Sequence, residues 1–316
     1  MLKKIIVCII AVICVAGILT PILENTDGED RLEVFVIAGQ SNSAYRNTNV
    51  SLVNQEIDLP SHNVYYYGTE SQPIYFGGMP PIGQATYDPT FESYDNYSMV
   101  SNGKWKIGGY EPILAKYISD KTNCDVLIIN VGISASSIQY LQPDADGGEY
   151  MKEVIEHSFE KIPSKYKVDK IGYMWVQGES NIGTPVDEYI SYFENINDWF
   201  IENGFNKGYI VQTRPQNSGN SAIAQVKMCN TIPNLILSST APDTFTIQNG
   251  KMVSDDLHYS QWGRIIVGED VCKHMSLTTY TQNKAVIDIM YILPVMLIIG
   301  IIGYLVFSYK KEDYLA

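Results

Sequence analysis

The sequence predicts an α/β protein, with a three-layer α/β/α domain around a central parallel sheet of about five strands. Segments with strand patterns alternate with segments of helical periodicity along most of the chain, as expected when helices connect the strands of a sheet. Several predicted strands are apolar at every position, including residues 34–37, and such strands are typical of a parallel sheet covered on both faces. The 316 residues, 45% of them hydrophobic, suffice for one large domain or two small ones.

The predicted elements follow one another between residues 33 and 275. After the opening strand at 34–37, residues 44–110 are rich in Tyr, Gly, Pro and Asn without a clear period, and we expect an irregular insertion there. Further strands are predicted at 125–132, 170–178, 207–214 and 234–239. Helices are predicted at 111–120, 149–162, 186–203 and 261–275, with a weaker helix between the last two strands. Residues 186–203 have apolar positions at helical spacing, and Gly204 follows as a stop signal.

Two apolar segments flank this domain. Lys3 and Lys4 precede an apolar run, and residues 1–23 are expected to be a signal peptide or an uncleaved signal anchor. Residues 285–309 are long and apolar enough to form a transmembrane helix. Residues 24–32 and 276–284 are expected to be linkers, and 310–316 a cytoplasmic tail.

The positive-inside rule gives the orientation of these segments. It places Lys310 and Lys311 in the cytoplasm, on the same side as the lysines near residue 1. The sequence therefore predicts a cell-membrane protein with its large domain outside. It crosses the membrane once, or twice if the first segment is retained.

Charge and cysteine usage exclude some classes of partner. The formal net charge of −13 argues against binding to nucleic-acid phosphates. Cys124, Cys229 and Cys272 lie outside the first apolar segment, and because three is odd, at most one disulfide can form among them. No cysteine pair has metal-ligand spacing, so we expect neither a metal site nor another cofactor.

A candidate nucleophile stands at the end of the first strand. Gly39, Gln40, Ser41 and Asn42 follow the apolar run directly, and open α/β sheets bind their ligands at the carboxyl ends of the strands. The same residues are also ordinary turn formers. A catalytic serine needs a histidine base and a carboxylate that orients it.

His258 is the best candidate base among the four histidines. It lies in a polar loop before the last predicted helix, whereas His157 and His274 lie on helices and His62 lies in the insertion. Asp255 precedes it by three residues, so a turn can bring the carboxylate to the near ring nitrogen.

Two further strand ends carry polar residues suited to acyl transfer. Gly132 follows the second strand, and Gln177 and Glu179 follow the third. The N–H of Ser41, Gly132 and the amide of Gln177 are suitable donors to a developing oxyanion. Glu179 is either a general acid or, as we favour, a buried carboxylate that braces the nucleophile loop.

The three motifs, in this order, resemble the sialate O-acetylesterase-like branch of the SGNH hydrolases, which includes the acetyl xylan esterases of carbohydrate esterase family 6. The motifs are Gly39-Gln40-Ser41-Asn42, Gln177-Gly178-Glu179-Ser180-Asn181 and Asp255-Asp256-Leu257-His258, and the resemblance covers roughly 33–275. It implies a flavodoxin-like fold and metal-independent removal of O-acetyl groups from sugars. By the match, Ser41 is the nucleophile, His258 the base and Asp255 its orienter, and Ser41, Gly132 and Gln177 form the oxyanion hole. Candidate supporting or substrate-binding residues are Gln40, Asn42, Arg46, Glu179 and Asn181, although Arg46 is equally well explained as an ordinary surface arginine.

The chain departs from the family pattern at three positions. Ser43 stands where the family often has Met, and Asn181 where it often has Asp. Asp256 stands where the family usually has Gly, so a second carboxylate could orient His258, although spacing favours Asp255. Ser43 also breaks the G-x-S-x-G pattern, which argues against an α/β-hydrolase nucleophile elbow.

The expected function is a membrane-tethered extracellular esterase that acts on O-acetylated carbohydrates. One alternative is a catalytically silent surface protein that binds glycans, and another is a short-chain lipid esterase. The aromatic side chains of the insertion, such as Tyr65 and Trp105, could form a sugar-stacking wall or could pack the insertion onto the sheet.

Overall fold

A mostly parallel sheet forms the centre of the computed structural model, which describes residues 30–44, 62, 64–68, 92–93, 100–101, 104–105 and 109–280. Within these ranges the sheet has seven strands in the order β3-β2-β6-β1-β7-β8-β9. Six of these strands run parallel, and the edge strand β3 pairs antiparallel with β2. The strands are β1 (Asp30–Gly39), β2 (Val64–Gly68), β3 (Glu92–Ser93), β6 (Asp125–Asn130), β7 (Tyr166–Val176), β8 (Gly208–Val211) and β9 (Leu235–Ser239). β4 (Val100–Ser101) and β5 (Lys104–Trp105) form a separate antiparallel pair.

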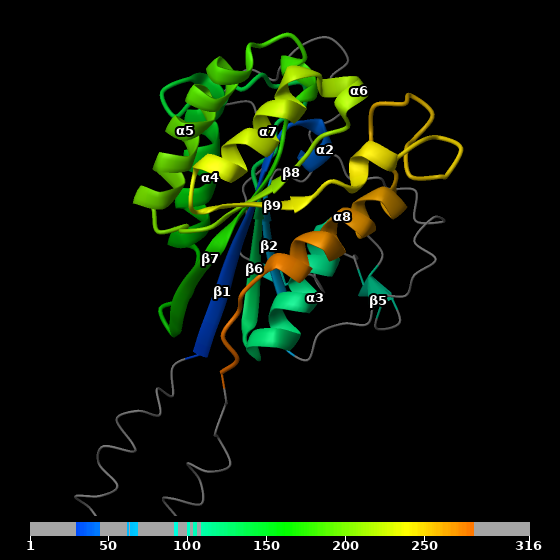
Figure 1. The fold of residues 1–316 in the computed structure, drawn as a ribbon. Helices are drawn as coiled ribbons and strands as arrows, with labels where there is room; N and C mark the ends of the chain where they lie inside the picture. Colours follow the sequence, from blue (N-terminus) through cyan, green and yellow to red (C-terminus); the bar gives the residue numbers. More distant parts are fainter. Residues whose placement is uncertain are drawn as a thin grey trace, which may run out of the picture. The chain divides into compact units, whose positions relative to one another are not determined.

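Helices cover both faces of the sheet (Figure 1). One hydrophobic cluster joins the strands to α4 (Asp146–Glu160), α5 (Val186–Glu202) and α7 (Asn220–Thr231). The other joins them to α3 (Glu111–Thr122) and α8 (Gln261–His274). The short helices are α2 (Ser41–Ala44), α6 (Pro215–Ser218), η3 (Glu179–Asn181) and η4 (Ala241–Thr244). The described residues therefore form the three layers that the alternating pattern predicts.

The buried strands explain why the sheet is parallel. Residues 34–38 of β1 have no exposed surface, because alternate side chains enter the two clusters on opposite faces. A strand buried on both faces must be apolar at successive positions, and helical crossovers keep both faces covered. β1 accordingly lies between β6 and β7, in the middle of the sheet.

The sheet is larger than the sequence predicts. Six parallel strands replace the expected five or so, because β2 lies within residues 44–110, for which we expect only an irregular insertion. Val64 and the tyrosines after it favour a strand but show no alternation that would reveal it. The ring of Tyr65 packs at the amino end of the sheet, where its hydroxyl contacts that of Tyr166 at 3.0 Å.

The predicted terminal segments, 1–23 and 285–309, lie outside the described residues. Among the helices of the described part, none combines the length and the apolar character needed to cross a bilayer. Cys124, Cys229 and Cys272 are described, and each is a free thiol.

Candidate active site

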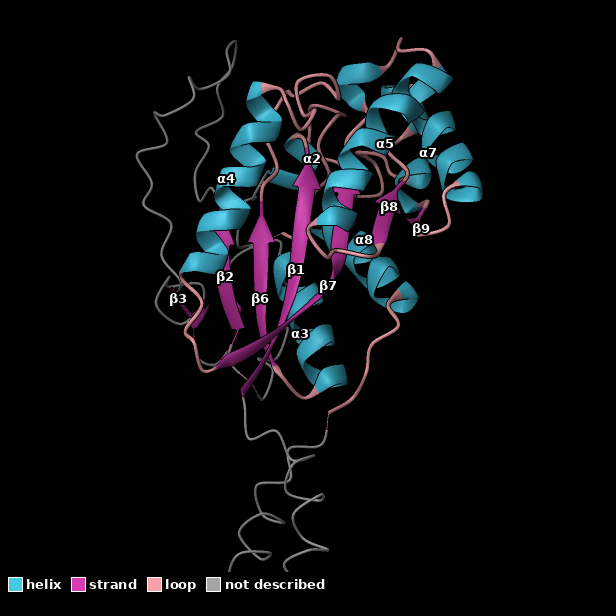
Figure 2. Ribbon diagram, turned by 90° about the vertical axis from the view of Figure 1, so that its left-hand side faces the viewer, coloured by secondary structure: helices cyan, strands magenta, loops and turns pink. Residues whose placement is uncertain are grey.

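The predicted site residues gather at the carboxyl edge of the sheet. β1 and β6 point toward α2, which begins at Ser41 (Figure 2). Gly132 follows β6 and Gln177 follows β7, the two strands that flank β1. Neighbouring parallel strands end at one edge, so segments distant in sequence meet there.

Gly39 makes the turn from β1 into α2 possible. Its φ is 132°, and a Cβ atom there would lie 2.1 Å from the carbonyl oxygen of Val176. The chain then turns at once, with the N–H of Gln40 donating to Val176 O at 2.9 Å. The amides of Ser43 and Ala44 donate to Gln40 O. Ser41 is therefore held in the first turn of α2, with 8% of its surface exposed.

Asp255 and His258 form a hydrogen-bonded pair. Asp255 Oδ2 lies 2.6 Å from His258 Nδ1. Asp255 Oδ1 accepts the peptide N–H groups of Leu257 at 2.9 Å and His258 at 3.0 Å, which fixes the carboxylate within its own turn. Burial raises the pKa of Asp255, but the bonds from the ring and peptide groups of His258 and from the peptide of Leu257 outweigh it, so the pKa lies below its ordinary value.

Asp256 makes a different contact, although it is adjacent. Its Oδ1 accepts from Arg214 Nη1 at 2.9 Å, an ion pair that the side chain of His258 does not share. Its backbone φ is 53°, in the left-handed region where Gly is favoured and Asp is tolerated. The geometry therefore brings Asp255, and not Asp256, to the imidazole.

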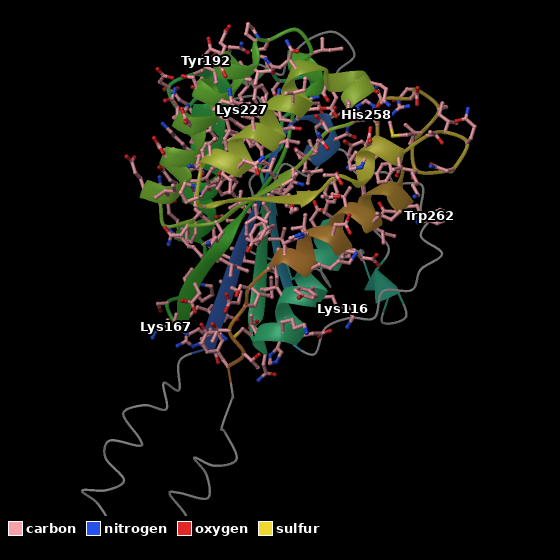
Figure 3. All side chains as sticks on the ribbon, viewed as in Figure 1. Lys116, Lys167, Tyr192, Lys227, His258 and Trp262 are labelled. Atoms are coloured by element: carbon pink, nitrogen blue, oxygen red, sulfur yellow. The ribbon has the colours of Figure 1, made fainter. Side chains whose placement is uncertain are left out.

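Asn42 connects the serine helix to the histidine loop. Its Oδ1 accepts the N–H of Tyr259 at 2.9 Å, and its Nδ2 donates to Leu257 O at 3.2 Å. These two groups flank His258, so the residue next to Ser41 holds the backbone on both sides of the imidazole. Figure 3 shows His258 at the same end of the domain as α2.

The carboxylate of Glu179 holds the side-chain amide of Asn42. Its Oε1 accepts Asn42 Nδ2 at 2.7 Å, and its Oε2 is buried without a hydrogen-bond partner. Burial raises the pKa of Glu179, an effect opposed by hydrogen bonds from its own peptide and the Asn42 amide and by the nearby His258. This carboxyl group holds the amide of Asn42, which agrees with the bracing interpretation.

The predicted oxyanion donors differ in whether their N–H groups are already hydrogen-bonded. Among the described residues the N–H of Ser41, the first of α2, has no hydrogen-bond partner, as is usual at a helix start. The N–H of Gly132 donates to Asn130 Oδ1 at 3.0 Å. A Cβ on Gly132 would lie 2.3 Å from Ser43 Oγ, so only glycine lets this loop approach α2.

Gln177 lies in the predicted place but does not present a free donor. Its Nε2 donates to Asn181 Oδ1 at 2.6 Å and to Ser136 O at 3.2 Å, which uses both amide hydrogens. Its Oε1 accepts from the hydroxyl of Tyr189 at 2.9 Å, and the side chain is fully buried. In this structure Gln177 joins the loops after β6 and β7, in contrast to the expected oxyanion contact.

The remaining predicted residues are partly accounted for. Gln40 Oε1 accepts the N–H of Ser180 at 3.2 Å, which joins the first motif to the second. Asn181 Nδ2 donates to Gln139 and Thr184, so its amide also connects loops. Arg46 lies outside the described residues.

Other site residues were missed by the sequence analysis. Asn130 Nδ2 donates to Ser43 O at 3.1 Å, and as a polar residue ending an apolar strand it carried the same signal as Gln177. Arg264 Nη1 and the hydroxyl of Tyr110 both donate to Asn42 O, at 2.9 and 3.0 Å. Arg264 lies within α8 and Tyr110 directly before α3, and neither has a local sequence pattern that marks it as a site residue.

The arrangement suits nucleophilic catalysis. When Nδ1 of His258 donates to Asp255, Nε2 is the ring nitrogen that can exchange a proton with a hydroxyl. Ser41 and Ser43 both adjoin Asn42, but the hydroxyl of Ser43 donates to Gln40 O at 2.6 Å, which leaves Ser41 as the candidate hydroxyl. Within the described ranges, no three His, Cys, Asp or Glu side chains gather as they would around a metal ion.

Comparisons with known proteins bear on the fold. No protein-family model matches the chain, and no curated protein matches it. A carbohydrate acetylesterase from Xanthomonas citri has a TM-score of 0.45 and 15% identity, covering 77% of this chain and 57% of that one. A protein from Arabidopsis thaliana of known structure has a TM-score of 0.52 and 12% identity, covering 76% of this chain and 96% of that one. The chain thus shares its α/β fold with the Arabidopsis protein, over nearly the whole of that protein.

Proposed function

We propose that the chain is a serine esterase that removes O-acetyl groups from carbohydrates. The observation that carries the proposal is the Asp255–His258 pair, tied to the serine helix through Asn42. The acetyl group and the sugar rest on the resemblance of the three motifs to the sialate O-acetylesterase-like enzymes.

The proposed reaction has two steps. Ser41 Oγ attacks the acetyl carbonyl while His258 Nε2 takes its proton, and the N–H of Ser41 donates to the developing oxyanion. His258 returns the proton to the sugar oxygen as the ester bond breaks, which leaves an acetyl-enzyme. Water then attacks the acetyl-enzyme with His258 again as base, releasing acetate and restoring Ser41. Asp255 keeps the hydrogen on Nδ1 throughout, so that Nε2 stays basic.

Acetate release by the full-length protein in mild detergent tests the proposal. We expect turnover of p-nitrophenyl acetate and of at least one acetylated glycan from a panel, abolished in Ser41→Ala and His258→Ala. A chelator should leave the rate unchanged, since neither step uses a metal. Absence of turnover by folded wild-type protein would point to a glycan-binding protein, and preference for longer acyl chains to a lipid esterase.

Membrane tethering is a separate part of the proposal and rests on the sequence. The apolar residues 285–309 followed by Lys310 and Lys311 support a helix that leaves the domain outside the cell. Protease added to intact cells should release the domain and leave the tail helix. Protection of the domain in intact cells, with digestion after lysis, would contradict this orientation.

A further inference from the structure

A polar cluster outside the triad holds the loop that carries His258. Arg214 follows β8, and Asn217 lies in α6; together with Asp256 we call these residues the turn clamp. Arg214 Nη1 donates to Asp256 Oδ1 at 2.9 Å and to Asp256 O at 3.2 Å. Asn217 Nδ2 donates to the same carbonyl oxygen at 2.8 Å. Both the side chain and the backbone of Asp256 are thus fixed to the segment that follows β8, at the start of α6.

The clamp acts at the tip of the turn. Asp256 N donates to Val253 O at 3.1 Å, and Val253 N donates to His258 O at 2.9 Å, so the turn is closed at its base. The positive φ of Asp256 reverses the chain between the carboxylate of Asp255 and the imidazole of His258. Movement of Asp256 would therefore change the distance between the Asp255 carboxylate and the His258 imidazole, which must stay hydrogen-bonded.

The ion pair differs from an ordinary surface pair. The side chain of Arg214 is 12% exposed and that of Asp256 52% exposed, so the guanidinium is largely withdrawn from water. Arg214 Nη1 also donates to Asn217 Oδ1 at 3.1 Å, which limits its freedom. Arg214 Nε is buried without a hydrogen-bond partner, so the guanidinium gives up hydration to reach this position. A largely buried, multiply bonded arginine is better suited to fixing geometry than a solvated one.

We propose that Arg214 and Asp256 are positioning residues, which hold the turn so that Asp255 stays on His258 and His258 stays beside the serine helix. The inference rests on the proposed function. Asp256 stands where the family that the motifs resemble usually has Gly; its backbone is in the left-handed region that glycine favours, and its side chain adds an anchor that glycine lacks.

Three variants separate the anchor from the backbone conformation. Asp256→Gly keeps the left-handed conformation and loses the ion pair, Arg214→Ala loses the ion pair from the other side, and Asp256→Asn keeps an acceptor for Arg214. We expect kcat to fall roughly 5- to 20-fold in the first two and less than about 3-fold in Asp256→Asn, with KM within about 2-fold throughout. The double variant Arg214→Ala/Asp256→Gly should be about as slow as Arg214→Ala alone, because the ion pair lost in Asp256→Gly is already lost in Arg214→Ala, together with the bond to Asp256 O.

The pH profile of kcat/KM distinguishes positioning from a change of charge. Among the described residues, the charged groups that face His258 include Asp255 and Glu179, with Asp256 and Arg214 in the adjoining clamp. By charge alone, loss of Arg214 would move the acid limb to higher pH and loss of Asp256 to lower pH. If the clamp positions Asp255, both variants loosen its pairing with the imidazole, and both acid limbs move to lower pH.

Lys227→Ala is the matched control, because it removes an exposed ion pair with Asp187 between α7 and α5. It should leave kcat and the acid limb unchanged. Unchanged kcat in Asp256→Gly, additive losses in the double variant or opposite shifts of the two acid limbs would overturn the inference. If Arg214→Ala does not fold, the kcat and the acid limb of Asp256→Gly alone test the inference. If the wild type shows no turnover, the proposed function fails, and the shift of the His258 imidazole titration followed by NMR still tests the clamp.

Discussion

At the scale of single residues, the turn at 255–258 assigns two adjacent carboxylates to different tasks. Asp255 accepts three hydrogen bonds from its own turn and from the imidazole, so the orientation of its carboxylate is fixed. Asp256 points to Arg214. The difference follows from the left-handed backbone at Asp256, which turns the second side chain away from the first.

The first prediction compares the two aspartates. Asp255→Asn should lower kcat by about 10³-fold or more, because an amide can hold the wrong tautomer of His258 and cannot stabilise the imidazolium. Asp256→Asn should cost less than about 3-fold, because the acceptor for Arg214 remains. Steady-state kinetics of the two purified variants, with folding checked by circular dichroism, measure this. A larger loss in Asp256→Asn would transfer the orienting role to Asp256.

The second prediction concerns Glu179. Glu179→Gln should keep most of the activity, because the amide oxygen can still accept from Asn42 Nδ2. Glu179→Ala should lower kcat about 10-fold or more and also lower the melting temperature, since the brace is gone and a buried amide hydrogen loses its acceptor. The kcat values and thermal melts of both variants check this. If Gln is as damaging as Ala, the carboxyl group donates a proton in the reaction.

At the scale of elements, the connection from β1 to α2 determines where Ser41, the proposed nucleophile, lies. α2 is a single turn, and it is held by the end of β7 through Gln40 and by Asn130 at the end of β6. Gly39 is the residue that allows the chain to leave β1 against the Val176 carbonyl. The precision of the site thus depends on the contact between neighbouring strand ends.

The third prediction follows from that contact. Gly39→Ala should destabilise the fold by roughly 2 kcal/mol or more, because the new methyl group would overlap the Val176 carbonyl and alanine disfavours a φ of 132°. Gly183→Ala is the control, since no atom lies within 4 Å of the Cβ position at Gly183. Urea unfolding of both variants measures the difference. Equal urea midpoints for Gly39→Ala and Gly183→Ala would contradict the prediction, because they would show that the ends of β1 and β7 separate easily to admit the methyl group.

At the scale of the whole molecule, a second charged cluster lies at the start of β1 and β7. Arg31 Nη1 pairs with Asp169 Oδ2 at 2.7 Å, and the ring of Tyr280 lies 4.1 Å from the Arg31 guanidinium. Glu33 is buried opposite Asp169 in the sheet register. Burial, together with Asp169, raises the pKa of Glu33 to about 7, despite the opposing charge of Arg31.

The fourth prediction uses this carboxyl group. The pKa of Glu33 is higher in the folded protein than its ordinary value of 4.5, so protonation favours folding. Its contribution to stability is complete below pH 4.5 and is lost as the pH rises through about 7. Glu33→Gln should therefore be more stable than wild type above pH 7, by roughly 1 to 3 kcal/mol, and nearly equal below pH 4.5. Denaturant unfolding from pH 4 to 9 checks this, and parallel curves for the two proteins would contradict it.

Much of the fold could be predicted because its signals are local. Apolar strands such as 34–37 and the helical spacing of 186–203 depend only on neighbouring residues, and both elements form. β2 could not be predicted in this way. Its tyrosines show no alternation, and its strand conformation depends on pairing with β6, which is some 60 residues away in the chain.

The sequence by itself determined the candidate nucleophile and the D-x-x-H turn, because polar residues at a strand end and a spacing of three are local patterns. The spacing favours Asp255 over Asp256, but only the tertiary structure shows that Asp255 contacts the imidazole while Arg214, 42 positions away, holds Asp256. The tertiary structure also brings Asn42 into contact with Leu257 and Tyr259, 215 and 217 positions away, on either side of His258. It places the side-chain amide of Gln177 in a hydrogen bond with Asn181, between two loops. Hydrogen bonds over such separations depend on how strand ends meet, and no spacing along the chain records that.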